Sequence, residues 1–323
     1  MYLHKVNTFL IVLNKLIMKI QQPPYLQKGD TIGITCPAGY MAAEKAAQCI
    51  ATLQQWGYQV MTGKTLGSYS DTYFSGTDNE RREELQAMLD DKNIKAILFA
   101  RGGYGMGRII DGLRFTKFKR NPKWLIGFSD VTVMHGHLYR QYNIASIHAQ
   151  MAAAFNDGGD TSLSVLSLKK MLAGKHFTIK SFAYPFNRKG QATGKLVGGN
   201  LTLLTNMLGT ASEIDTRGCI LFLEDLDEQL YAIDRLLRQL KRAGKFKNLA
   251  GVVLGGFTDM KDTERPFGKN IHELLQDVFA EYTYPVCYDF PVSHTAENMA
   301  LKIGATYQLK ITKSGATLAE AKI

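Results

Sequence analysis

One serine of this sequence stands where a nucleophile could be exposed. Residues 124–130 read Trp-Leu-Ile-Gly-Phe-Ser-Asp, an apolar run with strand character that ends in a turn, and the residues up to Tyr142 then have helical character. This order sets the Ser129 hydroxyl at a helix N-terminus, where unpaired backbone N–H groups can receive an oxyanion. The competing interpretation is that Ser129 or Asp130 only caps the helix. Val131 replaces the second glycine of the G-x-S-x-G elbow, so the tetrapeptide alone favours capping.

A serine nucleophile needs a general base, and the base needs a group that orients it. Among the seven histidines, His294 lies in a polar loop between extended segments, where site residues are common, although a lone histidine there is more often an ordinary surface residue. His148 ends a short strand and could line the same crevice as Ser129. Glu224 ends an apolar strand within an acidic cluster that also contains Asp225 and Asp227. Its carboxylate could fix an imidazole tautomer. The competing use of that cluster is helix capping.

A glycine-rich loop, Arg101-Gly-Gly-Tyr-Gly, follows another apolar strand. A dinucleotide fingerprint would require a third glycine at position 108, where Arg108 stands, and the lysine of a P-loop is also missing. The loop can still bring backbone N–H groups close to a ligand. A purely structural turn would explain one or two of its glycines but not all of them.

Strands that alternate with helices must position these groups. In the first half the pattern predicts strands within 29–35, 58–61, 96–100 and 123–128, and helices over 42–56, 77–89, 108–113 and 131–142. The strands are apolar enough to be covered on both faces, which indicates a parallel sheet. Because ligands gather beyond the carboxyl ends of parallel strands, we expect Ser129 and the glycine loop to face one crevice.

The second half of the chain repeats this alternation. Apolar strands are predicted at 195–200, 219–223, 251–256 and 286–288, helices at 201–208, 228–243 and 271–282, and short closing strands from Met299 onward. The segment around 155–161 and the polar stretch that follows indicate a break. We therefore predict an N-terminal extension at 1–27, a first domain at 28–155, a linker region at 156–190 and a second domain at 191–323.

The composition restricts the possible partners. The chain has 323 residues and a formal net charge of +10, yet its basic residues are scattered apart from one cluster at 235–247, which reads as the solvated face of a helix. No basic motif interleaved with aromatic residues and no zinc-finger spacing is present, so we expect no nucleic-acid partner. An anionic substrate is compatible with the charge.

Cysteine usage and the N-terminus bear on the compartment. The four cysteines lie far apart with no metal-like spacing, which predicts buried free thiols in a reducing compartment and no bound metal. The apolar run at 9–13 is too short to span a bilayer, and no small-residue cleavage site follows it, so we expect no stable membrane insertion. We interpret residues 1–17 as an extension, or as residues upstream of a true start at Met18.

Seven motifs in this order resemble the LD-carboxypeptidase family, the serine peptidases that include murein tetrapeptide carboxypeptidase and the microcin C immunity peptidase. The resemblance runs from about Lys28 to the C-terminus. It rests on Gly29-Asp-Thr-Ile-Gly-Ile with Pro37-Ala38, Arg101-Gly-Gly-Tyr-Gly, Gly127-Phe-Ser-Asp, Gly198-Gly-Asn-Leu, Leu223-Glu-Asp, Tyr231-x-Ile-Asp and Ser293-His. Residues 1–17 have no counterpart in the family.

The resemblance implies a role for each candidate residue. Ser129 would be the nucleophile, His294 the general base and acid, and Glu224 the group that orients the histidine. The backbone N–H groups of Gly103 and Asp130 would form the oxyanion hole. Arg101, Gly102, Tyr104 and His148 are the expected substrate-binding residues.

The resemblance also implies a fold and an activity. The fold would be an N-terminal Rossmann-like (flavodoxin-like) parallel-sheet domain and a smaller C-terminal α/β domain of swivelling-domain type, with the site in the cleft between them. The activity would be release of terminal D-alanine from murein tetrapeptide in peptidoglycan recycling, by a cytoplasmic homodimer that uses no cofactor and no metal. Three alternatives stay open: a microcin-type amide hydrolase acting on a modified aminoacyl nucleotide, a catalytically inactive muropeptide-binding protein, and a nucleotide-binding oxidoreductase, which the glycine spacing disfavours.

Overall fold

The buried apolar runs of the first half form the centre of a parallel sheet. In the computed structural model, which describes residues 20–321, five parallel strands lie in the order β5-β4-β3-β1-β2. Their bounds are β1 (Thr31–Thr35), β2 (Gln59–Thr62), β3 (Ile94–Phe99), β4 (Trp124–Gly127) and β5 (Ser146–His148). This is the flavodoxin-like strand order, so the fold class expected for the first domain is confirmed.

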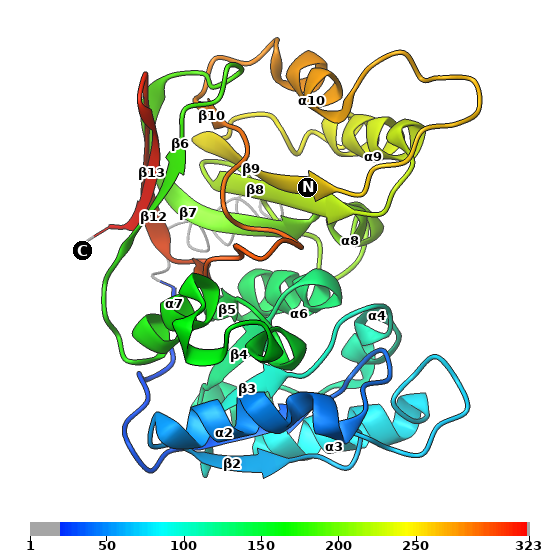
Figure 1. The fold of residues 1–323 in the computed structure, drawn as a ribbon, viewed down its shortest axis with the longest axis vertical. Coiled ribbons are helices and arrows are strands. Elements are labelled where there is room, and N and C mark those ends of the chain that lie inside the picture. Colours follow the sequence, from blue (N-terminus) through cyan, green and yellow to red (C-terminus); the bar gives the residue numbers. More distant parts are fainter. Residues whose placement is uncertain (1–19, 322–323) are drawn as a thin grey trace, which may run out of the picture.

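Helices cover both faces of this sheet (Figure 1). The apolar residues of α2 (Ala47–Gln55) and α7 (Leu163–Leu172) join one buried cluster with the sheet, and those of α3 (Asp78–Asp90), α4 (Met106–Ile109), α5 (Thr116–Arg120) and α6 (Thr132–His137) join another. Thr77 and Glu80 form the capping box that opens α3. Short irregular turns complete the domain at 43–46, 110–112, 129–131, 138–142, 152–156 and 159–161.

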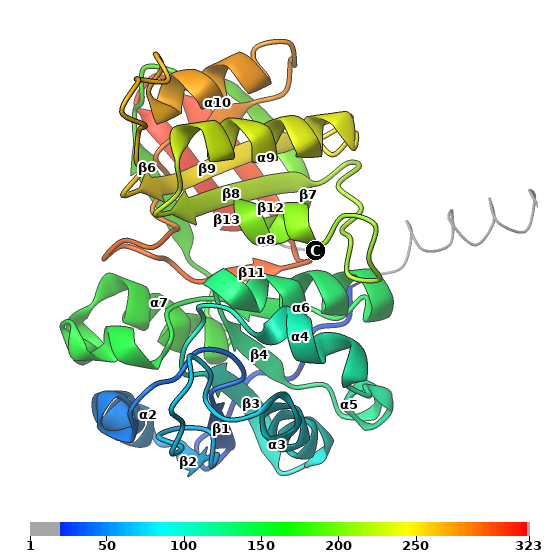
Figure 2. The same cartoon turned by 90° about the vertical axis from the view of Figure 1, so that its right-hand side faces the viewer.

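A seven-stranded mixed sheet forms the second domain, in the order β10-β9-β8-β7-β12-β13-β6. Its strands are β6 (Thr178–Phe182), β7 (Gly190–Asn200), β8 (Ile220–Leu226), β9 (Gly251–Thr258), β10 (Val286–Cys287), β12 (Thr306–Thr312) and β13 (Gly315–Glu320). Figure 2 shows α8 (Leu201–Asn206), α9 (Leu230–Arg242) and α10 (Ile271–Phe279) on one side of this sheet. On α9, Asp234 and Arg238 form an ion pair one helical turn apart, at 3.2 Å.

The boundary between the domains differs from the prediction. Helix α7 was placed in the linker region, yet its apolar side packs on the first sheet, so the chain crosses to the second domain only between Leu172 and Thr178. It crosses back near the C-terminus, where β11 (Leu301–Ile303) pairs antiparallel with β5 of the first sheet. The linker region predicted at 156–190 is therefore too long, because it includes a helix that belongs to the first domain.

The predicted N-terminal extension is also too long. Ile20 and Leu26 are buried in the first domain, and the Trp124 indole Nε1 donates to the Pro24 carbonyl at 2.9 Å. The extension assigned to residues 1–17 lies outside the described residues. Within 20–321 no helix combines the length and apolar character that crossing a bilayer requires. All four cysteines are buried free thiols, as expected.

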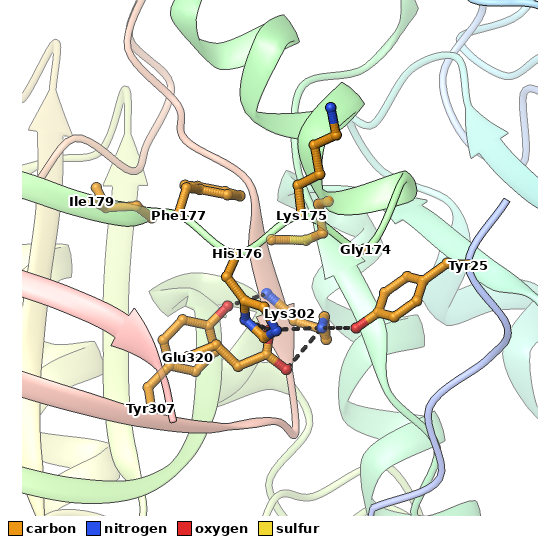
Figure 3. Close-up of a pocket in the computed structure, with 10 residues that line it drawn as sticks. Tyr25, Gly174, Lys175, His176, Phe177, Ile179, Lys302, Tyr307 and Glu320 are labelled. Carbon is orange, nitrogen blue, oxygen red and sulfur yellow. Dashed lines mark hydrogen bonds and ion pairs between the residues drawn. The ribbon is translucent and has the colours of Figure 1, made fainter. Parts of the chain in front are cut away.

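Two close contacts hold the domains together. At one, the buried Lys302 Nζ on β11 donates to both Glu320 carboxylate oxygens (2.7 and 2.8 Å) and to the Tyr25 hydroxyl (3.0 Å), as Figure 3 shows. At the other, a Cβ on Gly199 would lie 2.5 Å from Thr132 Oγ1, so only glycine lets β7 approach the start of α6 this closely. The second contact lies three residues from Ser129 and sets the spacing of the domains at the site.

Candidate active site

Ser129 occupies a sharp turn between β4 and the helical residues that follow. All four residues of β4 are buried, Phe128 is extended, and Ser129 has φ of +61°, in the left-handed region that a non-glycine residue adopts only under strain. Neither the 129–131 turn nor α6 begins with a side-chain capping hydrogen bond. The capping interpretation is therefore wrong, and the partly exposed Ser129 side chain stands at the end of the strand in the manner of a nucleophile elbow.

The buried Asp130 side chain turns away from its own helix toward the glycine loop. Its Oδ2 accepts from the backbone N–H of Met106 at 2.7 Å, and the N–H of Gly105 also donates to this carboxylate. Burial raises the pKa of Asp130 to about 6, although these two hydrogen bonds act in the opposite direction. Asp130, which follows the candidate nucleophile, thus connects the turn at Ser129 to the loop that follows β3.

A buried arginine holds the same loop from the other side. Arg81 on α3 is fully buried, donates to the carbonyl oxygens of Pro37 (2.5 Å) and Gly105 (3.4 Å), and pairs with Asp78. One guanidinium therefore fixes the loops after β1 and β3 relative to each other. Sequence reasoning missed Arg81, because an arginine in the first turn of an amphipathic helix resembles an ordinary surface residue.

The glycine loop runs directly past Ser129. A Cβ added to Gly102 would lie 3.1 Å from Ser129 Cβ and 3.3 Å from its Oγ, so a side chain at position 102 would crowd the serine side chain. Gly103 has φ of +90° and faces the Tyr73 hydroxyl. Among hydrogen bonds of the described backbone outside helices and strands, none is donated by Gly103 N–H. That group and the Asp130 N–H, at the start of a helical turn, are the two amides expected from the sequence to receive an oxyanion.

Glu224 of the second domain pairs with His294, which lies on the loop between β10 and β11. Glu224 lies on β8 with its side chain fully buried, and its Oε2 accepts from His294 Nδ1 at 2.6 Å, while the imidazole retains 13% exposure. Gly255 and Gly256 of β9 make room for this loop: a Cβ on either would collide with the Val292 carbonyl oxygen or Ser293 Oγ. Because Nδ1 is the donor to Glu224, Nε2 is left as the basic nitrogen.

An aromatic contact brings this pair to the candidate nucleophile. The ring of Phe128, the residue before Ser129, lies 4.7 Å from the His294 ring between centroids. The described residues contain no hydrogen bond between Ser129 and His294, and such bonds often close only when substrate binds. The structure thus brings together, from three separate segments, a strained serine, an imidazole and a buried carboxylate that orients it.

The predicted substrate-binding residues divide into two groups. Gly102 contacts Ser129, and Arg101 and Tyr104 lie on the same glycine loop with exposed side chains. His148 does not line the crevice, and that prediction is wrong: its side chain is fully buried, and its Nε2 donates to Asn298 Oδ1 at 3.0 Å. The end of β5 is covered by the 291–300 loop, which the sequence pattern did not reveal.

No group of histidine, cysteine, aspartate and glutamate side chains suited to a metal occurs within residues 20–321. The missed neighbours of the site are Arg81, Tyr73 and Asn298, none of which belongs to a motif with a recognisable spacing.

Buried histidines under the site predict a loss of stability in acid. Burial lowers the pKa of His135 to about 4 and that of His148 to about 3, so both stay neutral in the folded state while the unfolded chain binds protons below about pH 6.5. The contribution of the two neutral histidines to the free energy of unfolding is complete above that pH and is lost as the pH falls. Asp130 has a raised pKa, so its protonation stabilises the folded state as the pH falls from about 6 to about 4. This gain from one carboxyl group offsets only part of the loss from the two histidines.

We expect the free energy of unfolding to fall by on the order of 3 kcal/mol between about pH 6.5 and pH 4.5, since one pKa unit corresponds to about 1.4 kcal/mol. Urea denaturation at several pH values measures it. Asp130→Asn should steepen the decline, because it removes the opposing group. Constant or rising stability on acidification would show that these histidines are not buried neutral.

Comparison with known proteins places the chain in a family. A model of the LD-carboxypeptidase N-terminal domain matches residues 32–149, and a model of the LD-carboxypeptidase C-terminal domain matches residues 193–309. A probable murein peptide carboxypeptidase of Bacillus subtilis is 35% identical over 300 residues, which is 92% of this chain and 94% of that protein. The microcin C7 self-immunity protein MccF of Escherichia coli is 26% identical over 344 residues, covering 94% and 98%.

Among solved structures, muramoyltetrapeptide carboxypeptidase from Oxalobacter formigenes matches with a TM-score of 0.81 and 27% identity, covering 90% of this chain and 99% of that one. The two family models together match more than half of the described residues, in the order of the two domains of the structure. The chain therefore belongs to the LD-carboxypeptidase family.

Proposed function

We propose that this chain is a serine LD-carboxypeptidase that releases terminal D-alanine from murein tetrapeptide. Membership of the family supports a peptidase, and two of its relatives are named for murein peptides. The observation that carries the proposal is the buried Glu224–His294 pair at 2.6 Å, placed through Phe128 beside the strained Ser129. A catalytically inactive binding protein would have no need of this arrangement.

In the proposed mechanism His294 first acts as the base. Its Nε2 takes the proton of Ser129 Oγ as that oxygen attacks the carbonyl carbon of the residue before D-alanine, the diaminopimelate. Glu224 holds the imidazole in the required tautomer and stabilises the imidazolium. The imidazolium then gives its proton to the leaving nitrogen, D-alanine departs, and an acyl-enzyme remains. Water, deprotonated by His294, attacks the ester, and Ser129 recovers its proton.

The negative charge of each tetrahedral intermediate would be received by two backbone amides. The Asp130 N–H lies at the start of the 129–131 turn and the Gly103 N–H lies on the loop that passes Ser129. The hydrogen bonds from Met106 and Gly105 to the Asp130 carboxylate fix the loop and the elbow as one unit. Preorganised donors of this kind are the largest source of rate enhancement in acyl transfer.

We expect Arg101 to bind a carboxylate of the substrate. Its side chain is exposed on the loop whose next residue, Gly102, contacts Ser129. Its one hydrogen bond within the described residues goes to the Tyr40 carbonyl at 2.8 Å, which leaves donors for a ligand. Since a charge-assisted hydrogen bond contributes about 1.5–3 kcal/mol, Arg101→Met should raise KM roughly 10-fold to 100-fold and leave kcat within a factor of a few. Steady-state kinetics at low and high salt measure this.

The matched control is Arg120→Met, which removes an exposed arginine on α5. This helix precedes β4 and so lies at the amino-terminal end of the parallel strands, opposite the end that carries Ser129. Its KM should equal that of the unmodified protein. If Arg101→Met leaves KM unchanged at every salt concentration, Arg101 does not contact the substrate.

A place in peptidoglycan recycling, a cytoplasmic location and a homodimeric state are part of the same proposal. Murein tetrapeptide would reach such an enzyme as a product of cell-wall breakdown, and the four buried free thiols are compatible with a reducing compartment. Sedimentation velocity of the purified chain tests the homodimer directly.

A D-alanine release assay on tetrapeptide, tripeptide and pentapeptide tests the function. The proposal predicts rapid release from the tetrapeptide alone. The sequence similarity to MccF makes a modified aminoacyl nucleotide the competing substrate, so the same preparation is assayed on an aminoacyl sulfamoyl adenosine. Faster turnover of that compound would favour the microcin-type activity, and turnover of neither, with no labelling by a serine reagent, would leave a binding protein.

A further inference from the structure

The loop that carries His294 is attached to both domains. It starts after β10, in the second sheet, and ends at β11, in the first sheet, where Leu301 pairs with His148 of β5. Figures 1 and 2 show this segment, coloured orange to red, passing between the two domains. His294 therefore does not simply belong to the domain of its partner Glu224.

Helix α7 of the nucleophile's domain holds this loop through two buried serines. Ser164 Oγ donates to the Ala296 carbonyl at 3.0 Å and accepts from Asn298 N–H at 2.8 Å, and Ser167 Oγ accepts from Ala300 N–H at 2.8 Å. Both serine side chains are at most 2% exposed. Buried hydroxyl groups need hydrogen-bond partners, because water cannot reach them. Here the backbone of the loop provides those partners.

Strand β5 supplies the third attachment. His148 and Asn298 are both fully buried, and His148 Nε2 donates to Asn298 Oδ1 at 3.0 Å. His148 pairs in register with Gly127 of β4, and its ring lies 5.7 Å from that of Phe128. A continuous path of contacts thus runs from the strand that delivers Ser129, through His148 and Asn298, to the loop that carries His294.

We propose that His148, Asn298 and Ser164 are positioning residues that hold His294 in register with Ser129. The inference rests on the proposed function. Ser129 and Glu224 lie on different domains, and a displacement of about 1 Å between reacting groups costs roughly 100-fold in rate. The three side chains act through His294 by fixing its loop to the sheet that bears the nucleophile.

The test compares variants that break one attachment with variants that keep it. His148→Leu removes the donor to Asn298, whereas His148→Gln retains an N–H donor at a similar reach. Ser164→Ala removes both bonds of that serine. Ser212→Ala is the matched control, because Ser212 is a buried serine that bonds to a histidine, His137 Nδ1 at 3.0 Å, away from the loop.

Two rates are measured on each folded variant: D-alanine release, and phosphonylation of the protein by a fluorophosphonate, in which the serine oxygen displaces fluoride from phosphorus. The second reaction needs the serine and histidine but no peptide. We expect His148→Leu and Ser164→Ala to lower kcat and the phosphonylation rate about 10-fold to 100-fold with KM nearly unchanged. His148→Gln should recover most of the loss, and Ser212→Ala should react at the unmodified rate.

The outcomes separate the two proposals. Phosphonylation of the unmodified protein without D-alanine release would overturn the proposed substrate, and the variants would still report on positioning. No phosphonylation of the unmodified protein would overturn the serine mechanism itself. Phosphonylation of His148→Leu and Ser164→Ala at the unmodified rate, or an equal loss in Ser212→Ala, would overturn the positioning inference.

Discussion

Replacing Ser129 with alanine is expected to lower kcat for D-alanine release by roughly 10⁴-fold or more. The change removes one oxygen atom that makes no capping bond, so neither the elbow nor α6 loses a structural contact. What remains is the substrate site and the oxyanion amides, which by themselves give a small residual rate. Steady-state kinetics, with thermal unfolding to confirm the fold, measure the effect.

Ser129→Gly separates chemistry from stability at the same position. At φ of +61° a side chain is strained and glycine is not, so this variant should be inactive yet more stable than the unmodified protein by on the order of 1 kcal/mol. Near-full D-alanine release by either variant would rule out Ser129 as the nucleophile.

Replacing Glu224 with glutamine is expected to lower kcat by roughly 10³-fold or more, with KM little changed. The carboxylate is fully buried and its Oε2 meets His294 Nδ1 at 2.6 Å, so loss of its charge removes the stabilisation of the imidazolium. The new amide can also donate to Nδ1 and so favour the wrong tautomer, and the corresponding change in a serine protease triad costs about 10⁴-fold. The pH dependence of kcat measures both effects.

Asp227→Asn is the matched control for Glu224→Gln. Asp227 belongs to the same acidic cluster and pairs with Lys261 at 2.5 Å, and its φ of +57° suits asparagine. This variant also loses one negative charge but should keep its activity. Equal losses in both variants would mean that the local charge, and not the orientation of His294, is what Glu224 provides.

The local parts of the site could be predicted because they depend on short stretches of sequence. The apolar run before Ser129 specifies a buried strand, and the glycines at 102 and 103 allow the close approach that the structure shows. The pairing of Glu224 with His294 joins residues 70 positions apart. No periodicity encodes that contact, and only the order of motifs shared with a family pointed to it.

The predictions that were wrong concern segments whose environment is determined by distant parts of the chain. From the sequence, His148 is expected at the accessible carboxyl end of a strand. In the structure, the loop that ends at β11 covers this residue. Helix α7 lies within the predicted linker region, yet six of its ten residues are buried and its apolar side chains complete the first core. Asn298 has no local signature at all, since its role depends on a side chain 150 residues earlier.

The most direct test of the account is to locate the site of covalent labelling. Trypsin should release residues 124–140 as one peptide, in which Ser129 is the single serine. After treatment with a fluorophosphonate, mass spectrometry should find one adduct per chain, on Ser129, and none in the His294→Ala variant. An adduct on another residue, or an unlabelled protein that still releases D-alanine, would contradict the assignment of Ser129, His294 and Glu224 as the catalytic group.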